Sequence, residues 1–239
     1  MNLLLLQPGE VRPDGTARLR GRRAAHVREV LRLVPGESLR AGVVGGARGE
    51  GKVLALSEEE LVLELRLDEP PLQRTGVSLL LALPRPKALR RLLPALSSLG
   101  VERVVLVNAA RVEKSYFSSP VLTPATVEEL FLLGAEQAGD TILPTLTTRE
   151  RFRPFVEDEL DALFPAGPRL VAHPGAHSGV REAATGAGPL LLAVGPEGGW
   201  VPFELELLCA ARFVPCSPGP RILRVEVAVP YLLGQLAGG

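Results

Sequence analysis

The residues best suited to chemistry form a glycine-rich loop at 195–200, which reads Gly-Pro-Glu-Gly-Gly-Trp. An apolar run at 190–194, typical of a buried strand, precedes it, and a helix is expected to begin near Pro202. Loops at the carboxyl ends of parallel strands bind ligands in α/β proteins, and glycines let the backbone approach a ligand closely. The spacing is neither that of a P-loop nor that of Gly-x-Gly-x-x-Gly, so a nucleotide hydrolase has no support. A ligand loop is predicted, with a plain structural turn as the alternative.

Two further loops carry groups that could complete such a site. Residues 217–224 read Ser-Pro-Gly-Pro-Arg-Ile-Leu-Arg and follow a short predicted strand at 213–216. This stiff loop could form one side of an adenine pocket, while Arg221 or Arg224 faces an anion. Residues 111–117 combine two cations, a carboxylate and two aromatic rings, which could hold a phosphate and stack a base. On composition alone, an exposed loop is the stronger interpretation of 111–117.

The apolar pattern from residue 77 onward predicts the scaffold for these loops. Buried strands are expected at 77–83, 101–107, 170–172 and 190–194. Leucines at helical spacing predict a helix over 89–99 that Gly100 ends, and a second helix is expected from Pro124 to Ala138. This alternation predicts a parallel sheet covered by helices on both faces.

The N-terminal part predicts a different architecture. Short β-prone runs separated by turns indicate a small all-β module, with strands expected at 39–44, 53–56 and 61–67. A short helix over 26–33 leads to a Pro35-Gly36 turn, and His26 is interpreted as a structural contact. Residues 68–76 contain two prolines and little periodicity, which is typical of a linker. The predicted domains are therefore 1–70 and 76–239.

Charge is unevenly distributed along a chain whose formal net charge is zero. Residues 1–52 hold ten Lys and Arg against five Asp and Glu, so a basic module precedes an acidic body. This arrangement suits a phosphate-rich partner, with a merely solvated charged face as an equal alternative. The composition, 46% hydrophobic and 23% charged, excludes a disordered chain.

Targeting and metal signals point to no special compartment or metal centre. No apolar run is long enough to cross a bilayer, and the first residues lack the basic flank of a secretory leader, so a cytoplasmic protein without a membrane partner is expected. Cys209 and Cys216 do not have metal-ligand spacing, and neither a disulfide framework nor a bound metal is expected.

Five motifs together carry a family resemblance. They are the loop at 195–200, Gly-Pro-Arg-Ile-Leu-Arg-Val-Glu at 219–226, the segment 26–36, the loop at 111–116 and Glu-Gln-Ala at 136–138. In their order along the chain, these motifs resemble those of the ribosomal RNA uridine-N3 methyltransferases of the SPOUT class. The resemblance covers nearly the whole chain, and the pair of loops at 195–199 and 219–224 is its specific part.

The resemblance implies properties that spacing does not show. It implies an α/β fold whose C-terminal SPOUT domain is threaded into a deep trefoil knot, preceded by a PUA-like β-barrel that holds RNA. It further implies a homodimer that uses S-adenosylmethionine and methylates 16S ribosomal RNA of the small ribosomal subunit. Knots are nearly absent from proteins, so no hydrophobic pattern would predict one.

The resemblance also assigns residues to the site. The cofactor residues belong to two glycine-containing loops and to a histidine that opens toward the same pocket: His173, Gly195, Glu197, Gly198, Gly199, Gly219, Ile222 and Leu223. The candidates for RNA contact are arginines of the basic N-terminal module and two residues of the 111–117 loop: Arg22, Arg23, Arg28, Arg32, Lys114 and Tyr116.

Methylation of uridine N3 requires loss of the imide proton, and negative charge then builds on the two flanking carbonyl oxygens. Donors already aimed at those oxygens stabilise the transition state. Arg111 or Arg224 is expected to face the uracil oxygens or an adjacent phosphate, and Glu136 is a candidate proton acceptor. Because N3 lies on the pairing edge, the uridine must be unpaired or flipped out.

Two departures from the family pattern concern the C-terminal segment. Val227 stands where similar sequences usually have Thr, and Pro230 follows where a helix former is usual. Alternation of valines over 225–229 is typical of a strand, whereas the resemblance implies a helix with Pro230 confined to its first turn. These oddities motivate a second hypothesis, a PUA-like RNA-binding protein without catalysis. A third is a knot-class methyltransferase that acts on transfer RNA or on a ribose hydroxyl.

Overall fold

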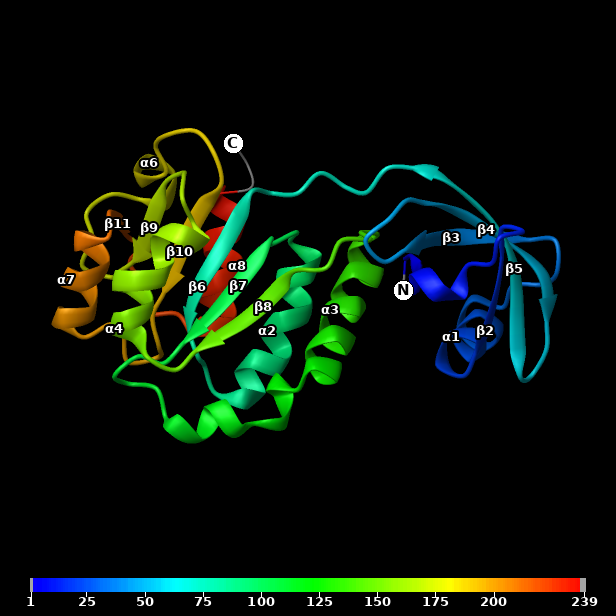
Figure 1. Ribbon diagram of the computed structural model, residues 1–239, viewed down its shortest axis with the longest axis horizontal. Coiled ribbons are helices and arrows are strands. Elements are labelled where there is room, and N and C mark those ends of the chain that lie inside the picture. The colour runs from blue at the N-terminus through cyan, green and yellow to red at the C-terminus, as the bar shows by residue number, and fades with distance from the viewer. Residues whose placement is uncertain (1, 237–239) are drawn as a thin grey trace. The chain divides into compact units, whose positions relative to one another are not determined.

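The computed structural model describes residues 2–236, which divide into two compact units (Figure 1). The first unit comprises residues 2–73 and Leu132–Leu143, and the second comprises Arg74–Phe131 and residues 144–236. The predicted domain boundary at 70–76 assigned 132–143 to the second domain. These residues group with the first unit because Leu132, Ala135 and Leu143 pack with Leu3 and Leu5. Within residues 2–236, no helix is both long enough and apolar enough to cross a membrane.

A five-stranded mixed sheet forms the first unit. Its strands are β1 (Leu4–Leu6), β2 (Thr16–Arg20), β3 (Ser38–Val43), β4 (Arg48–Leu56) and β5 (Glu60–Glu69). Their order is β1-β3-β4-β5-β2, with β1 parallel to β3 and every other neighbouring pair antiparallel. The three predicted runs correspond to β3, β4 and β5, whereas β1 and β2 were not predicted.

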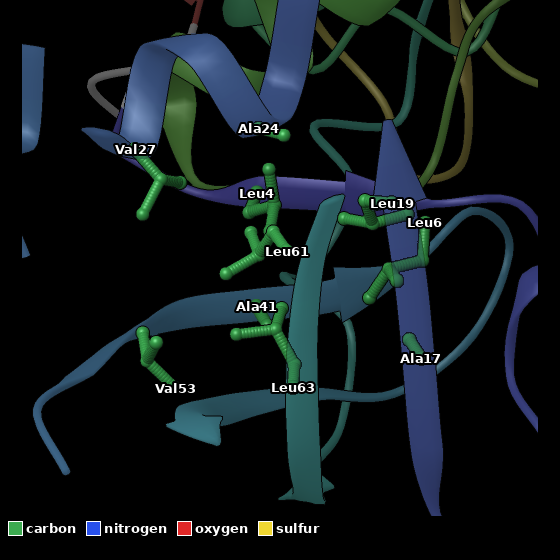
Figure 2. Packing of buried hydrophobic residues seen from close by; sticks show 10 residues of the cluster. All are labelled: Leu4, Leu6, Ala17, Leu19, Ala24, Val27, Ala41, Val53, Leu61 and Leu63. Carbon is green, nitrogen blue, oxygen red and sulfur yellow. The ribbon is translucent and has the colours of Figure 1, made fainter. Parts of the chain in front are cut away.

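Alternate residues of these strands build the core of the first unit. Ala17 lies opposite Leu63 and Leu19 opposite Leu61 in the β2–β5 register, and all four side chains are buried (Figure 2). The period of two is the one a half-buried strand requires. Apolar burial along this face therefore sets the register of the sheet.

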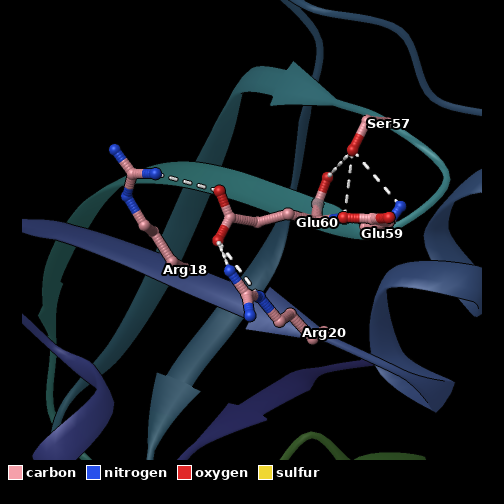
Figure 3. Close-up of polar contacts among 5 residues, drawn as sticks. All are labelled: Arg18, Arg20, Ser57, Glu59 and Glu60. Carbon is pink, nitrogen blue, oxygen red and sulfur yellow. Dashed lines mark hydrogen bonds and ion pairs between the residues drawn. The ribbon is translucent and has the colours of Figure 1, made fainter.

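Charged pairs occupy the other face of the same two strands. Figure 3 shows Glu60 between Arg18 and Arg20, at 2.9 Å and 3.3 Å from their guanidinium nitrogens. The hydroxyl oxygen of Ser57 accepts hydrogen bonds from the backbone of Glu59 and Glu60 in the β4–β5 turn. Exposed pairs of this kind contribute little energy, so the apolar face decides the fold.

The predicted helix near His26 is confirmed. It comprises α1 (Arg22–His26) and a π-helical continuation over Val27–Leu31, and it ends where Arg32 takes a left-handed φ of 55°. Burial lowers the pKa of His26, whose Nε2 is buried without a hydrogen-bond partner in the part of the chain described. A short 3₁₀ turn, η1 (Pro8–Glu10), lies between β1 and β2.

A six-stranded sheet forms the centre of the second unit. Its strands are β6 (Val77–Ala82), β7 (Arg103–Val107), β8 (Thr145–Arg149), β9 (Arg169–Ala172), β10 (Leu190–Val194) and β11 (Phe213–Cys216). The order is β11-β9-β10-β6-β7-β8 and every neighbouring pair is parallel (Figure 1). The prediction of a parallel sheet is confirmed. β8 was not predicted, because this edge strand is polar and largely exposed.

Helices and short turns connect these strands. The helices are α2 (Pro86–Ser98), α3 (Pro124–Ala138), α4 (Phe152–Pro154), α5 (Leu160–Leu163), α6 (Val180–Ala183), α7 (Pro202–Ala210) and α8 (Val225–Leu236). Three further helical turns are η3 (Lys114–Ser118), η4 (Pro120–Leu122) and η5 (Phe155–Glu159). The helices predicted over 89–99, 124–138 and from 202 are confirmed as α2, α3 and α7. The segment from α4 to α5 was not predicted.

Helix α8 corrects two expectations about the C-terminal segment. Val225, Val229, Leu232 and Leu233 are buried at helical spacing, so the strand suggested by alternating valines is wrong and the helix implied by the resemblance is right. Pro230 lies inside the helix and not in its first turn. A proline there removes one backbone hydrogen bond, and burial of the apolar face against α2 and α6 offsets that loss.

Candidate cofactor site and active site

The loops after three adjacent strands meet at one edge of the parallel sheet. β10 pairs with β6 on one side and with β9 on the other, and β9 pairs with β11. In the sheet, β7 and β8 therefore lie on one side of β6, and β10, β9 and β11 lie on the other side. Ligands of open α/β sheets bind at the carboxyl ends of strands near such a reversal.

A cavity lies among these loops within the second unit. It is lined by residues that follow β9, β10 and β11 and by the inner face of α8. Six of the eight predicted cofactor residues line it: His173, Gly195, Glu197, Gly199, Ile222 and Leu223. Gly198 and Gly219 belong to the same loops but are not in its wall. Arg221, named from the sequence as a possible anion contact, also lines the cavity.

Two glycines of the 195–200 loop lie close to neighbouring side chains. A Cβ atom on Gly195 would lie 3.1 Å from the Trp200 ring, and one on Gly198 would lie 2.9 Å from Cδ of Arg111. Both distances are shorter than ordinary carbon contacts. The missing side chains therefore let the loop pass close to Trp200 and Arg111.

Trp200 is a site residue that the cofactor predictions omitted. Its ring lines the cavity, is 6% exposed and packs on Phe152 with ring centroids 5.5 Å apart. Its Nε1 is buried and has no hydrogen-bond partner in the described part of the chain. A buried donor without a partner is unfavourable, so a ligand that offers an acceptor would satisfy this group.

The 111–117 loop is attached to the glycine-rich loop. The guanidinium of Arg111 donates a hydrogen bond to the carbonyl oxygen of Gly198. The neighbouring backbone N–H of Ala110 donates to a carboxylate oxygen of Glu204 at 2.6 Å, and the N–H of Val201 donates to its other oxygen at 3.0 Å. Arg111 is thereby held beside the 195–200 loop.

Glu204 was missed by the sequence analysis. Its side chain is buried, and its two oxygens join the start of α7 to the loop that carries Arg111. Glu204 lies three residues after Val201, the N-cap of α7. A glutamate at this position often accepts a hydrogen bond from the N-cap backbone, as in a capping box, and this spacing was the signal in the sequence. The local signal indicates a cap and not the contact with Ala110.

Arg224 lies next to the cavity and not in its wall. Its carbonyl oxygen accepts the first hydrogen bonds of α8, from the N–H groups of Val227 and Ala228. Arg224 lines a neighbouring groove, which shares Glu197, Ile222 and Leu223 with the cavity. Arg111 thus contacts the 195–200 loop, whereas Arg224 ends the 217–224 loop.

Glu136 is not among the cavity-lining residues. It belongs to the first unit, where its carboxylate lies 3.7 Å from the guanidinium of Arg22 and its carbonyl oxygen accepts from the N–H groups of Asn2 and Leu3. Burial raises the pKa of Glu136, and the nearby arginines oppose this shift. These contacts favour a structural part for Glu136.

The four arginines of the first unit that were predicted to contact RNA differ in how many hydrogen bonds they already make within that unit. Arg23 donates to Glu10 and to the carbonyl of Leu5, and its hydrogen bond to Glu10 holds the pKa of that carboxyl below its usual range. Arg28 donates to two carbonyls in the 57–58 turn. Arg22 and Arg32 are exposed. Arg23 and Arg28 are therefore used mainly within the first unit.

The two predicted RNA contacts of the second unit lie at the start of η3. Lys114 is exposed, and the hydroxyl of Tyr116 donates to Glu113 at 3.0 Å. Partial desolvation and the Glu113 contact raise the pKa of Tyr116. Among the described residues, no group of three or more His, Cys, Asp or Glu side chains could hold a metal ion.

Comparison with known proteins identifies the protein family to which this chain belongs. Residues 71–237 match the family model described as an RNA methyltransferase domain. The chain is 31% identical over 233 residues to the ribosomal RNA small subunit methyltransferase E of Treponema pallidum, which covers 95% of this chain and 87% of that protein. A second relative, the methyltransferase E 1 of Borreliella burgdorferi, is 22% identical over 228 residues, with 95% and 94% covered. The chain belongs to the ribosomal RNA small subunit methyltransferase E family.

A solved structure shares the fold along nearly the whole chain. The crystal structure of a ribosomal RNA small subunit methyltransferase E from Neisseria gonorrhoeae, bound to S-adenosyl methionine, superposes with a TM-score of 0.78 at 21% identity. The match covers 99% of this chain and 95% of that one. The family resemblance inferred from the loop motifs is confirmed.

Removal of the Glu204 carboxylate is expected to destabilise the site. Glu204→Ala removes the acceptor of two partly buried N–H donors, those of Ala110 and Val201, which costs about 1–3 kcal/mol in the free energy of unfolding and releases the Arg111 loop. Urea unfolding measures the loss, with Glu206→Ala, an exposed change on the same helix, as control. Equal stability of the two variants would show that Glu204 does not hold the loop.

Glu136→Gln is expected to change stability in a pH-dependent way. Because the folded-state pKa is raised, the stability that Glu136 contributes is present at low pH and is lost as pH rises through that pKa. Glutamine does not titrate, so the variant gains melting temperature relative to wild type as the pH is raised from about 4.5. Thermal melts over a series of pH values test it, with the exposed Glu129→Gln as control.

The same variant tests the proton-acceptor hypothesis. If Glu136 is structural, Glu136→Gln retains the single-turnover methylation rate. A rate loss of about 100-fold or more would instead identify this carboxylate as a general base.

Proposed function

We propose that this protein transfers the methyl group of S-adenosylmethionine to N3 of a uridine in 16S ribosomal RNA of the small ribosomal subunit. The observation that carries the proposal is the cavity among the loops after β9, β10 and β11, which six of the eight predicted cofactor residues line. Membership of the ribosomal RNA small subunit methyltransferase E family supports the RNA substrate.

The residues of the cavity fit this cofactor. Ile222 and Leu223 offer apolar contact to an adenine, the Glu197 carboxylate offers acceptors for ribose hydroxyls, and the unpartnered Nε1 of Trp200 offers a donor. Gly195 leaves room where a Cβ would press on the Trp200 ring. When bound, S-adenosylmethionine supplies an electrophilic methyl group on a sulfonium centre.

Arginines supply the electrostatics for the uridine. Loss of the N3 proton leaves negative charge on the two uracil carbonyl oxygens, and guanidinium groups remain charged at every relevant pH. We assign Arg111 and Arg224 to these oxygens or to the adjacent phosphate. The Glu204 carboxylate keeps the Arg111 loop in place before substrate arrives, so little reorganisation is needed during the reaction.

The finer description of the fold is also a proposal. The mixed sheet of the first unit supports a PUA-like β-barrel, and the exposed Arg22 and Arg32 with Lys114 and Tyr116 provide RNA contacts. Insertion of β10 between β6 and β9, followed by return of α8 to pack against α2, supports a trefoil knot in the SPOUT domain.

A homodimer is part of the proposal. Val227 and Tyr231 are each 50% exposed one helical turn apart on α8. Exposed apolar side chains so close to the cofactor loops support a second copy of the chain on this face.

The alternative of an RNA-binding protein without catalysis rested on Val227 and Pro230. Val227 is exposed and Pro230 sits in an intact helix, and neither lines the cavity. The observations that motivated this alternative therefore do not affect the cofactor site. Action on transfer RNA or on a ribose hydroxyl is distinguished by the identity of the product.

The direct test is methylation in vitro. Purified protein is incubated with methyl-labelled S-adenosylmethionine and undermethylated small ribosomal subunits, and labelled nucleosides are identified by chromatography and mass. N3-methyluridine is the expected product, and Arg224→Ala is expected to lower the rate at least about 100-fold. The control is Arg153→Ala, an exposed arginine outside the cavity. A different labelled nucleoside, or RNA binding without label, would contradict the proposal.

A further inference from the structure

A basic groove adjoins the cofactor cavity within the second unit. Its volume is about 640 Å³, and it shares Glu197, Ile222 and Leu223 with the cavity. Its other wall is the first part of α2, which contributes Arg85, Lys87 and Arg91. We call this depression the α2 groove.

Positive charge dominates the α2 groove. Arg85, Lys87, Arg91 and Arg224 line it, against the carboxylates of Glu197 and Glu226. Glu197 is already paired with Arg85, whose Nε lies 3.0 Å from its carboxylate, while α2 itself contains no acidic residue. With the Arg85–Glu197 pair counted as neutral, the groove keeps Lys87, Arg91 and Arg224 against Glu226, and this excess of cations fits a ligand with several negative charges.

Groups suited to bases lie at the same edge. Ile222, which is 95% exposed, belongs to both depressions. Tyr116 belongs to the 111–117 loop, which Arg111 joins to the carbonyl oxygen of Gly198, the residue after Glu197. A polynucleotide offers both the charges and the rings that such a surface contacts.

We propose that the α2 groove binds the sugar-phosphate backbone of the RNA strand that carries the target uridine, with Lys87 and Arg91 on its phosphates. The inference rests on the proposed function, because it takes the adjoining cavity as the place where the methyl group is delivered. A flipped-out nucleotide remains joined to its neighbours, so its flanking phosphates must lie beside that cavity. Phosphate contacts fix the register of the strand without reading its sequence.

Helix α2 provides a matched control. Arg90 and Arg91 are consecutive exposed arginines, but Arg91 lines the groove and Arg90 does not. Consecutive helical side chains point about 100° apart. The variants Arg90→Glu and Arg91→Glu therefore change the net charge equally and differ in whether they change the groove.

The test measures binding to unmodified 16S ribosomal RNA transcribed in vitro over a series of salt concentrations. Arg91→Glu is expected to weaken binding about tenfold and to lower the salt dependence by about one released counterion, whereas Arg90→Glu stays within about twofold of wild type. Lys87→Ala is expected to act like Arg91→Glu with a smaller effect. Thermal melts confirm that the variants are folded.

Three outcomes would overturn the inference. They are equal weakening by Arg90→Glu and Arg91→Glu, no weakening by Arg91→Glu and Lys87→Ala, and loss of S-adenosylmethionine binding in calorimetry by Arg91→Glu with RNA affinity unchanged. The last would assign the groove to the cofactor. Failure of the proposed function looks different, because wild-type protein would then bind this RNA without methylating small subunits, while the contrast between Arg90→Glu and Arg91→Glu would still report on the groove.

Discussion

The parallel pairing of β10 with both β6 and β9 is the interaction on which the site depends. It places the 195–200 loop, the loop after β9 and the loop after β11 at one edge of the sheet. None of these loops forms a cavity alone, since each contributes one wall. The buried apolar side chains of β9 and β10 supply most of the stabilisation, because parallel strands are covered on both faces.

A small polar network then connects the loops. The buried carboxylate of Glu204 accepts from two backbone N–H groups, and Arg111 donates to the carbonyl of Gly198. Buried hydrogen bonds have defined directions, so they specify positions that apolar packing leaves adjustable. The 195–200 loop and the loop that carries Arg111 are thus joined by hydrogen bonds.

The sequence predicted the parts of the fold whose signals are local. The glycine-rich loop, the buried strands β6, β7, β9 and β10 and the helices α2, α3 and α7 all follow from runs, spacing and end signals. The strand β8 was missed because it is polar and largely exposed, and β1 and β2 were missed because three and five residues are too few to show a clear period. For α8, the family resemblance was right where alternation was misleading, because burial on one side of a helix is decided by its neighbours.

The site was predicted less completely than the fold. Glycines indicated the cofactor loop, but Trp200 and the contact between Glu204 and Ala110 depend on residues far apart in sequence. Glu136 was assigned from its motif, whereas its surroundings, Arg22 and the start of β1, are set by the tertiary fold. Likewise, the groove that Arg85 and Arg91 line could not be predicted, because it forms only when α2 lies beside the 217–224 loop.

The central claim is that S-adenosylmethionine binds in the cavity lined by Trp200, and the chain offers a direct probe of it. Trp200 is the only tryptophan in the sequence, so its intrinsic fluorescence reports on this cavity alone. Titration with S-adenosylmethionine is predicted to change that fluorescence saturably, with the same dissociation constant as calorimetry. Binding detected by calorimetry without any change in tryptophan fluorescence would place the cofactor elsewhere and contradict the account.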